Sequence, residues 1–272
     1  MFSAERSRSR ASSAFGLLAL IFHASVRNIR KGHGNAMLGL VMNVVQTLIL
    51  VAVFWVISHI FGQRGQIRGD PILFVMSGIF MFMTHSKTMG AVSGAEGPTS
   101  SMMLHAPMNT IIAIAAAALS TLYIQILSIC FVLFFYHAIV SPITIHEPVG
   151  ALAMLLVSWA SGIGIGMIFL AAKPWSPDLI GIIVKVYMRA NMIASGKMFV
   201  ANNTPSRILQ WFDWNPLFHT IDQGRGFIFL NYNPHNSSIS YPVWIAAATI
   251  VLGLMGEFFT RKHISASWSA RG

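Results

Sequence analysis

The 272-residue chain has one cysteine and few acidic residues, and both shortages limit its chemistry. Cys130 alone can form neither an internal disulfide nor a cysteine-based metal cluster. Aspartate and glutamate together number only eight. The apolar runs hold almost none of the carboxylates that carriers use to bind protons or sodium ions. The composition therefore weighs against an ion-coupled carrier.

Several catalytic motifs are also missing. The sequence contains no Walker phosphate loop, no HExxH metal motif and no serine nucleophile elbow. Gly162, Gly164 and Gly166 lie in an apolar run without a neighbouring Lys-Ser/Thr pair, so they favour helix packing over nucleotide binding. We predict no catalytic residue, no metal site and no cofactor in this chain, which is therefore not expected to be an enzyme.

Apolar sequence is abundant, since 55% of the residues are hydrophobic and only 10% are charged. Uncharged runs of about 20 residues recur, which is the length that a helix needs to cross a bilayer. The pattern predicts an all-α polytopic membrane protein with one six-helix domain over residues 35–272. The six predicted spans are residues 37–61, 71–89, 110–137, 150–172, 179–201 and 242–260. Polar residues within the first span are expected to face other helices rather than lipid: Asn43, Gln46 and Thr47.

The first 34 residues are predicted to form a cytosolic tail and an interface helix. Residues 1–13 are rich in serine and arginine, which favours disorder. From residue 14 to residue 31, apolar side chains recur at spacings of three and four among basic ones. This run is too short to span and is typical of an amphipathic helix lying on the inner membrane face.

The placement of lysine and arginine predicts the topology. With the N-terminus inside, eleven cations fall in inner segments and four in outer segments. The inner ones are Arg6, Arg8, Arg10, Arg27, Arg30, Lys31, Lys87, Lys173, Arg261, Lys262 and Arg271. The outer ones are Arg64, Arg68, Arg207 and Arg225. Cytosolic loops are enriched in such residues, so both termini are expected in the cytosol. Because the cations lie beside apolar runs, phospholipid headgroups explain them better than nucleic acid does.

Residues 211–230 are largely apolar, but charged residues and a proline interrupt the run, so it is not predicted to span the membrane. Asn215 followed by Pro216 is a helix-start signal, which predicts a short helix at residues 216–230. Three aromatic residues precede it: Trp211, Phe212 and Trp214. Tryptophan at this density favours the membrane–water boundary. We expect a helix that dips into the membrane from the outer face and returns.

Two charged residues lie inside this predicted helix. Asp222 and Arg225 are three apart, so they are expected to pair on one helix face. The alternative is a surface amphipathic helix without a role in transport.

The fifth predicted span contains an unusual number of cations. At about 100° per residue, Lys185, Arg189 and Lys197 fall at about 0°, 40° and 120°, on one side of the helix. Each such charge costs about 2.5–3.5 kcal/mol at the bilayer centre, so this face is not expected to meet lipid. One hypothesis is a basic path for an anionic substrate. The other is that Lys185 and Lys197 extend to opposite membrane faces and Arg189 pairs with a carbonyl group.

The segment before the last span resembles that of polysaccharide-export ABC permeases, the type-2 ABC membrane subunits that export capsule or O-antigen-type glycans. The likeness rests on Trp214, Asn215, Pro216, Leu217, Phe218, His219, Ile221, Asp222, Arg225 and Tyr232. The interface helix, the six spans and the re-entrant outer hairpin are similar too, and the likeness covers most of the chain. At position 222 the family more often has glutamate.

The resemblance implies a permease that works with partners. Two copies would form the pore in the bacterial inner membrane, and separate ATPase subunits would bind ATP and magnesium. The inner loop at residues 87–107, with Glu96, and the N-terminal helix would contact the ATPase. The cargo would be an anionic or lipid-linked glycan, passed on to periplasmic or outer-membrane export components.

Other functions remain open at this stage. An ABC permease for a drug or another lipid would have the same fold. An ion-coupled secondary carrier or channel, or a structural membrane scaffold, would need no ATPase.

Overall fold

The computed structural model describes residues 10–31, 35–60, 69–97 and 109–269, and within these it contains helices and no strand. The helices, in chain order, are α1 (Arg10–Lys31), α2 (Ala36–Ile60), α3 (Pro71–Ser93), α5 (Thr110–Ile139), α6 (Pro148–Ala172), α7 (Pro177–Ala194), the short 3₁₀ turn η1 (Ala201–Asn203), α8 (Ser206–Leu209), α9 (Pro216–Ile228) and α10 (Ser240–Ser269). The predicted all-α class is confirmed for these residues.

In the part of the chain that the structure describes, five helices are long and apolar enough to cross a membrane: α2, α3, α5, α6 and α10. They correspond to five of the six predicted spans. The remaining run, predicted at residues 179–201, is helical only to Ala194. The resulting helix, α7, has 18 residues and a length of about 27 Å. It includes Asp178, Lys185 and Arg189, so its composition differs from that of the five candidate spans.

The other predicted boundaries differ by a few residues. Helix α3 continues to Ser93, four residues past the predicted end, and α10 continues to Ser269. Helix α1 begins at Arg10, so the last residues of the predicted disordered tail are helical. The first nine residues lie outside the described part of the chain.

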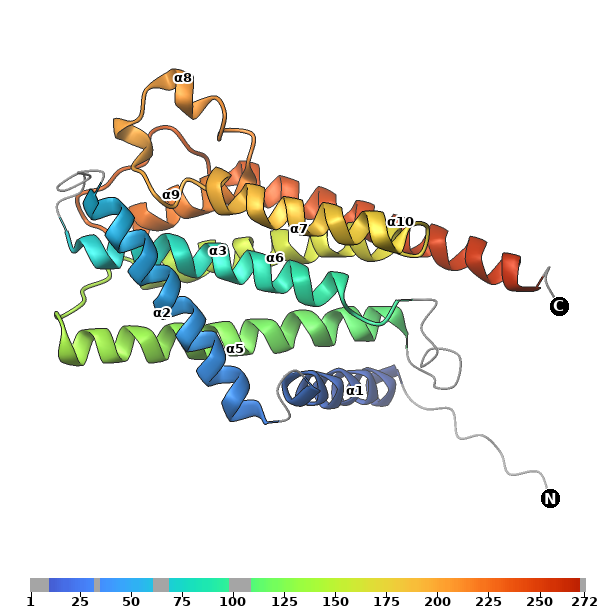
Figure 1. Ribbon diagram of the computed structural model, residues 1–272. Coiled ribbons are helices and arrows are strands. Elements are labelled where there is room, and N and C mark those ends of the chain that lie inside the picture. The colour runs from blue at the N-terminus through green and yellow to red at the C-terminus, as the bar shows by residue number, and fades with distance from the viewer. Residues whose placement is uncertain (1–9, 32–34, 61–68, 98–108, 270–272) are drawn as a thin grey trace.

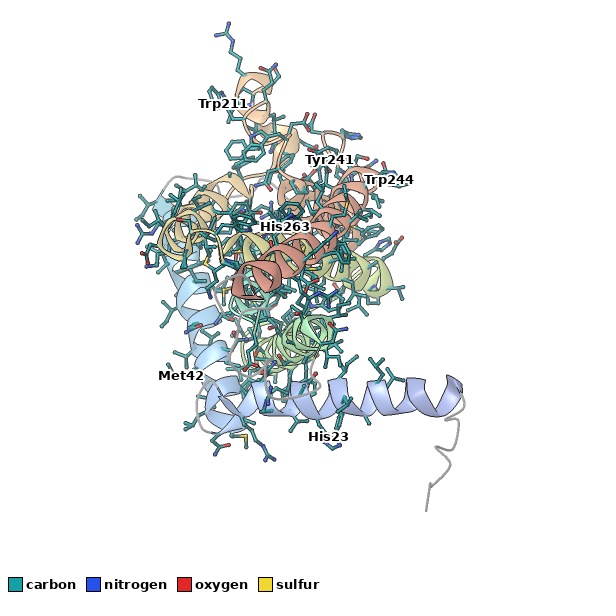
Figure 2. The ribbon with its side chains drawn as sticks, turned by 90° about the vertical axis from the view of Figure 1, so that its right-hand side faces the viewer. His23, Met42, Trp211, Tyr241, Trp244 and His263 are labelled. Atoms are coloured by element: carbon teal, nitrogen blue, oxygen red, sulfur yellow. The ribbon has the colours of Figure 1, made fainter. Side chains whose placement is uncertain are left out.

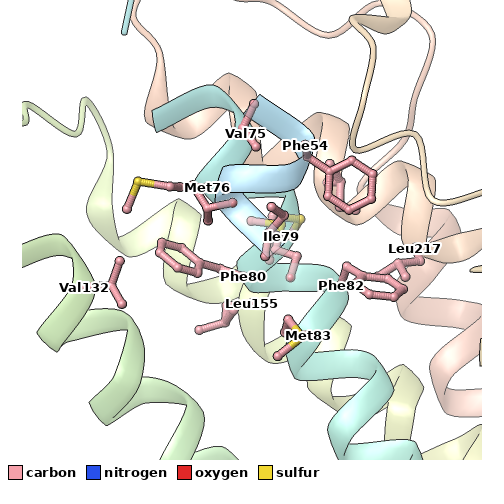
Figure 3. Close-up of a cluster of buried hydrophobic side chains, with 14 of the residues drawn as sticks. Phe54, Val75, Met76, Ile79, Phe80, Phe82, Met83, Val132, Leu155 and Leu217 are labelled. Carbon is pink, nitrogen blue, oxygen red and sulfur yellow. The ribbon is translucent and has the colours of Figure 1, made fainter. Parts of the chain in front are cut away.

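Helix α3 lies at the centre of the bundle. It packs against α6, α5, α9 and α2, and most of its residues are buried. Figure 3 shows the apolar cluster around its first half, which includes Met76, Ile79 and Phe80 together with Leu155 of α6 and Leu217 of α9. Because α3 is covered on all sides, it connects the two ends of the bundle through a rigid, packed element.

Glycines allow α6 to approach two helices closely. A Cβ atom on Gly162 would lie 2.6 Å from the His85 carbonyl oxygen of α3. A Cβ atom on Gly164 would lie 2.2 Å from Thr249 Oγ1 of α10. The predicted packing role of these glycines is therefore confirmed, and α6 lies between α3 and α10.

Asn43 makes the interhelical contacts expected of the polar residues of α2, whereas the hydroxyl of Thr47 bonds within its own helix. Asn43 is buried and donates to Gln125 Oε1 and to Ser128 Oγ of α5, the latter at 2.8 Å. Thr47 is buried beside it, and its hydroxyl donates to the Asn43 carbonyl. Gln46 is exposed, and its side chain accepts a hydrogen bond from Lys87 of α3.

Helix α1 lies crosswise to the bundle and packs across α5 (Figures 1 and 2). Ala24 packs against Ile112 and Ala116 of α5. Apolar side chains on other parts of the helix stay exposed, among them Leu18 and Phe22. A crosswise helix with exposed apolar residues is typical of an amphipathic element at a membrane surface. We refer to this end of the molecule as the α1 end.

Candidate functional site

Helix α7 ends at Ala194, inside the run that was predicted as the fifth span. Gly196 follows with a φ of 69°, the left-handed conformation that commonly terminates helices. The chain then turns away through η1 and α8. The prediction of a continuous helix to residue 201 is therefore wrong, and Gly196 is the sequence signal that could have corrected it.

The end of α7 exposes carbonyl groups that need hydrogen-bond donors, because a helix leaves its last four carbonyls without partners. Three side chains supply such donors. Asn215 Nδ2 donates to the Ala194 carbonyl at 2.9 Å, and Lys197 Nζ donates to the Met192 carbonyl. Arg225 Nη1 donates to two carbonyls in the segment that follows. We call Asn215, Lys197 and Arg225 the α7 cap.

Arg225 is almost fully buried, at 1% exposure. Its guanidinium donates to the carbonyls of Gly196 at 3.2 Å, Phe199 at 2.9 Å and Lys197, and it lies 3.7 Å from the centre of the Phe74 ring. Gly78 of α3 makes room for it, since a Cβ atom there would lie 2.9 Å from Arg225 Nη2. Arg225 thus joins the segment after α7 to both α9 and α3.

The predicted direct pair between Asp222 and Arg225 is not formed. The Asp222 carboxylate instead accepts hydrogen bonds from the Tyr232 hydroxyl and, at 2.7 Å, from Ser237 Oγ. The two charges still attract each other electrostatically. The spacing of three residues correctly placed Asp222 and Arg225 close together on α9. Their hydrogen-bond partners lie outside the helix, however, and helical spacing does not predict such contacts.

The helix-start signal of α9 is confirmed. The Asn215 side chain accepts from the Leu217 amide at 3.0 Å, and Pro216 is the first helical residue. The helix ends at Ile228, two residues before the predicted end, and most of it is buried against α3, α6 and α10. Because α9 is mostly buried, it is not the surface helix that was the alternative prediction.

Both ends of α9 lie at one end of the bundle, where α6 and α10 begin. The His219 ring is 4.6 Å from the ring of Tyr241, the second residue of α10. Phe227 lies against Gly150, near the start of α6. In between, Gly224 contacts Met81 of α3 and Met154 of α6, so the helix lies within the bundle. We refer to this end as the α9 end.

Aromatic residues before α9 project from the bundle. Trp211 is 75% exposed and Trp214 is 63% exposed, and Figure 2 shows Trp211 on the protruding segment. Phe212 instead packs against Phe199 and Phe218. Tyr241 of α10 donates its hydroxyl to the Trp214 carbonyl at 2.9 Å, which attaches the segment to the bundle.

The segment between α9 and α10 is hydrogen-bonded to α9. The Ser238 amide donates to His219 Nδ1 at 3.0 Å, so His219 Nε2 has the proton that is donated to the Asp213 carbonyl at 2.7 Å. Burial raises the pKa of the Tyr232 hydroxyl, and the nearby Asp222 carboxylate raises it further. Tyr232 therefore stays protonated and keeps donating to Asp222.

A series of polar side chains runs from α9 into the centre of the bundle. Asn215 Nδ2 donates to Asn191 Oδ1 at 2.8 Å, and Tyr187 lies four residues before Asn191, on the same face of α7. Tyr187 in turn lies 3.2 Å from His85 Nε2, and His85 Nδ1 lies 2.9 Å from Ser161 Oγ. We call these five residues the polar chain; it links α9, α7, α3 and α6.

The three cations predicted on one face of the fifth span are not brought together. Lys185 and Arg189 are exposed on α7, whereas Lys197 follows the helix and is 2% exposed. The Lys197 amine lies 3.8 Å from the centre of the Phe82 ring and 4.7 Å from that of Phe54. The calculated angle of Lys197 was wrong because it assumed that the helix continued past Gly196.

Glu96 lies at the α1 end, on the wall of a cavity of about 330 Å³. Arg27 and Asn28 of α1 and Ser120 and Thr121 of α5 also line it. The predicted inner loop at residues 87–107 is helical through Ser93, and residues 98–108 lie outside the described part. The segment around Glu96 thus connects α3 to the interface between α1 and α5.

Among the described residues, no group of three or more histidine, cysteine, aspartate or glutamate side chains is arranged to hold a metal ion. The buried polar groups instead cap helices and join them. Together with five candidate membrane spans and a crosswise helix α1, this arrangement defines a polytopic helical membrane domain.

Residues 17–229 match the family model of ABC-2 type transporters, and the chain belongs to this family. No curated protein matches its sequence. The protein is therefore a multi-pass permease subunit of an ABC transporter. In this family the membrane subunit works with a separate ATPase subunit and is expected to form dimers.

Proposed function

We propose that this permease exports a polysaccharide, in an anionic or lipid-linked form, of the capsule or O-antigen class. The observation that supports this best is the structural role of the residues that resemble glycan exporters. Asn215 and Pro216 start α9, and Arg225 caps the segment after α7. Asp222 and Tyr232 bond to each other and hold the segment after α9. The residues that resemble those of glycan exporters thus lie together in and around α9 rather than at scattered positions.

The exposed cations of α7 provide a path for the cargo in this proposal. Lys185 and Arg189 are exposed on the single chain, and lipid is a costly environment for them. A second copy would enclose this face, and an aqueous path along it would attract phosphate or carboxylate groups. The buried amine of Lys197 would shape the end of α7 that borders the path.

The ATPase would bind at the α1 end. The cavity lined by Arg27 and Glu96 joins α1 to the end of α3, so force applied there would reach the central helix directly. ATP and magnesium would be bound by the ATPase. In this orientation α7 would be the sixth crossing, so that the α1 end and both termini face the cytosol of the bacterial inner membrane. The α9 end would face the periplasmic or outer-membrane components that receive the glycan.

A deletion strain tests the cargo. Loss of the surface glycan, with polymer accumulating inside the cell and recovery on expression of the intact chain, is the expected result. Normal surface glycan in the deletion strain would instead favour an ABC permease for a drug or another lipid. The ion-coupled alternative predicts that no ATPase copurifies and that transport in vesicles proceeds without ATP.

A further inference from the structure

Helix α7 has little apolar packing to hold it in place. Asn191 is its one buried residue, while α3 is buried over most of its length. Leu179, Ile182 and Val186 are exposed. The backbone of α7 packs mainly against α3 and α6, the side chain of Asn215 bonds to its last turn, and Gly196 follows in a left-handed turn. Individual hydrogen bonds therefore have a large share in fixing its position.

The most central of these bonds joins α7 to α3. The Ser161 hydroxyl donates to the Ser158 carbonyl at 2.7 Å, so Ser161 Oγ accepts from His85 Nδ1–H at 2.9 Å. His85 Nε2 then has no proton and accepts from the Tyr187 hydroxyl at 3.2 Å. His85 is 1% exposed, so water does not replace Tyr187 in the packed state. Each bond in this series has a defined direction, which favours one position of α7.

We propose that His85 is a positioning residue for transport: through Tyr187 it holds α7 against α3 and α6, and this bond opens during the ATP-driven cycle. Hydrogen bonds weaken steeply with small changes of distance and angle, so a modest shift of α3 is enough to release Tyr187. His85 lies about 12 Å along α3 from Ser93, the last residue of the helix, and the segment that contains Glu96 follows directly. The opening step rests on the proposed binding of the ATPase to that segment.

A cross-linking experiment tests the contact without any cargo. Gly90 of α3 faces Met188 of α7, since a Cβ atom on Gly90 would lie 3.2 Å from Met188 Cε. We would introduce Gly90→Cys and Met188→Cys in a Cys130→Ala background, which removes the natural thiol. The full-length permease in lipid nanodiscs would then be treated with a short thiol-to-thiol cross-linker, and the rate of intramolecular cross-linking would be measured.

In this background, Tyr187→Phe removes only the hydroxyl and keeps the ring that packs edge-on against Phe169, 5.7 Å away. We expect cross-linking to slow by about two- to tenfold, as loss of one hydrogen bond predicts. Tyr123→Phe is the matched control, because Tyr123 is 58% exposed on α5, and its rate should equal that of the parent. Equal rates for Tyr187→Phe and the parent would overturn the proposal.

Two variants of His85 separate positioning from simple packing. Glutamine has both a donor and an acceptor, so His85→Gln is expected to cross-link at nearly the parent rate. Leucine has neither, so His85→Leu is expected to slow cross-linking as Tyr187→Phe does. If both variants slow it equally while Tyr187→Phe has no effect, His85 only fills space and the proposal is wrong.

The opening step is tested in the complex with the copurifying ATPase. ATP is expected to slow cross-linking in the parent and to have little further effect in Tyr187→Phe, where the bond is already missing. An ATP effect of the same size in both proteins would show that the cycle does not act through this bond. Because no substrate is added, the result is independent of whether the cargo is a glycan.

Discussion

Gly78 shows how a single residue permits the buried cations to approach α3. A Cβ atom there would lie 2.8 Å from Lys197 Cβ and 2.9 Å from Arg225 Nη2. Gly78→Ala is expected to reduce the free energy of unfolding by about 1–3 kcal/mol, as overpacking does. Thermal unfolding in detergent would show this as a lower melting temperature. Gly181→Ala, at a helical position with open space around it, should leave the melting temperature unchanged or slightly higher.

Arg225 has a larger expected effect, because its loss leaves carbonyl groups without donors. Arg225→Leu would remove the bonds to Gly196, Lys197 and Phe199. Each unsatisfied buried polar group costs about 1–3 kcal/mol, so we expect a loss of at least about 3 kcal/mol in unfolding free energy. Arg207→Leu, at an exposed position in α8, should change it by less than about 0.5 kcal/mol. Similar melting temperatures for the two variants would contradict a capping role for Arg225.

The C-terminal end of α7 and the N-terminal end of α9 meet at Asn215, which forms hydrogen bonds to both helices. Its side chain caps α9 and also donates to Ala194 and Asn191 of α7. Asn215→Ala is expected to raise amide hydrogen exchange in the first turn of α9 and in the last turn of α7. A lost N-cap costs about 0.5–2 kcal/mol, equivalent to roughly two- to thirtyfold faster exchange.

Asn109 provides the matched control. It caps α5 by accepting from the Ile111 amide at 3.3 Å, and it is exposed. Asn109→Ala should raise exchange only in the first turn of α5. If Asn215→Ala likewise affects only α9, the bonds from Asn215 to α7 do not stabilise that helix.

The elements differ in how well the sequence predicted them. The five candidate spans were predicted because crossing a membrane demands long apolar runs, and that demand is visible locally. The start of α9 was predicted because its cap and its proline are adjacent in sequence. The end of α7 was missed because the apolar run continues past Gly196, where a change of φ rather than of hydropathy ends the helix.

The site was predicted only in part, for a related reason. Asn215 and Pro216 act locally, so their roles could be inferred from spacing. Arg225 and Lys197 bind backbone carbonyls, and carbonyls give no signal in a sequence. His85 was not singled out, because its partners Ser161 and Tyr187 lie far away along the chain and only the folded bundle brings them together.

At the scale of the whole molecule, the exposed face of α7 suits an assembly better than an isolated chain. Apolar residues such as Ile182 and Ile193 are exposed beside the two cations, Lys185 and Arg189. A lipid environment suits the apolar residues but not the charges. A permease dimer that encloses this face would resolve the conflict, since apolar residues would pack at the contact and the cations would face water.

This arrangement predicts that Arg189 acts on transport rather than on assembly. Arg189→Ala is expected to lower export by about tenfold, equivalent to about 1.4 kcal/mol of lost stabilisation for an anionic cargo in the path. If the cargo is the glycan proposed above, the amount of surface glycan on cells containing the variant would measure the effect. Copurification of the ATPase should be unchanged, because Arg189 does not line the cavity that contains Glu96 at the α1 end. Arg189→Lys, which keeps the charge, should retain most of the export. If Arg189→Ala exports normally, the exposed cations of α7 do not line the path of the cargo.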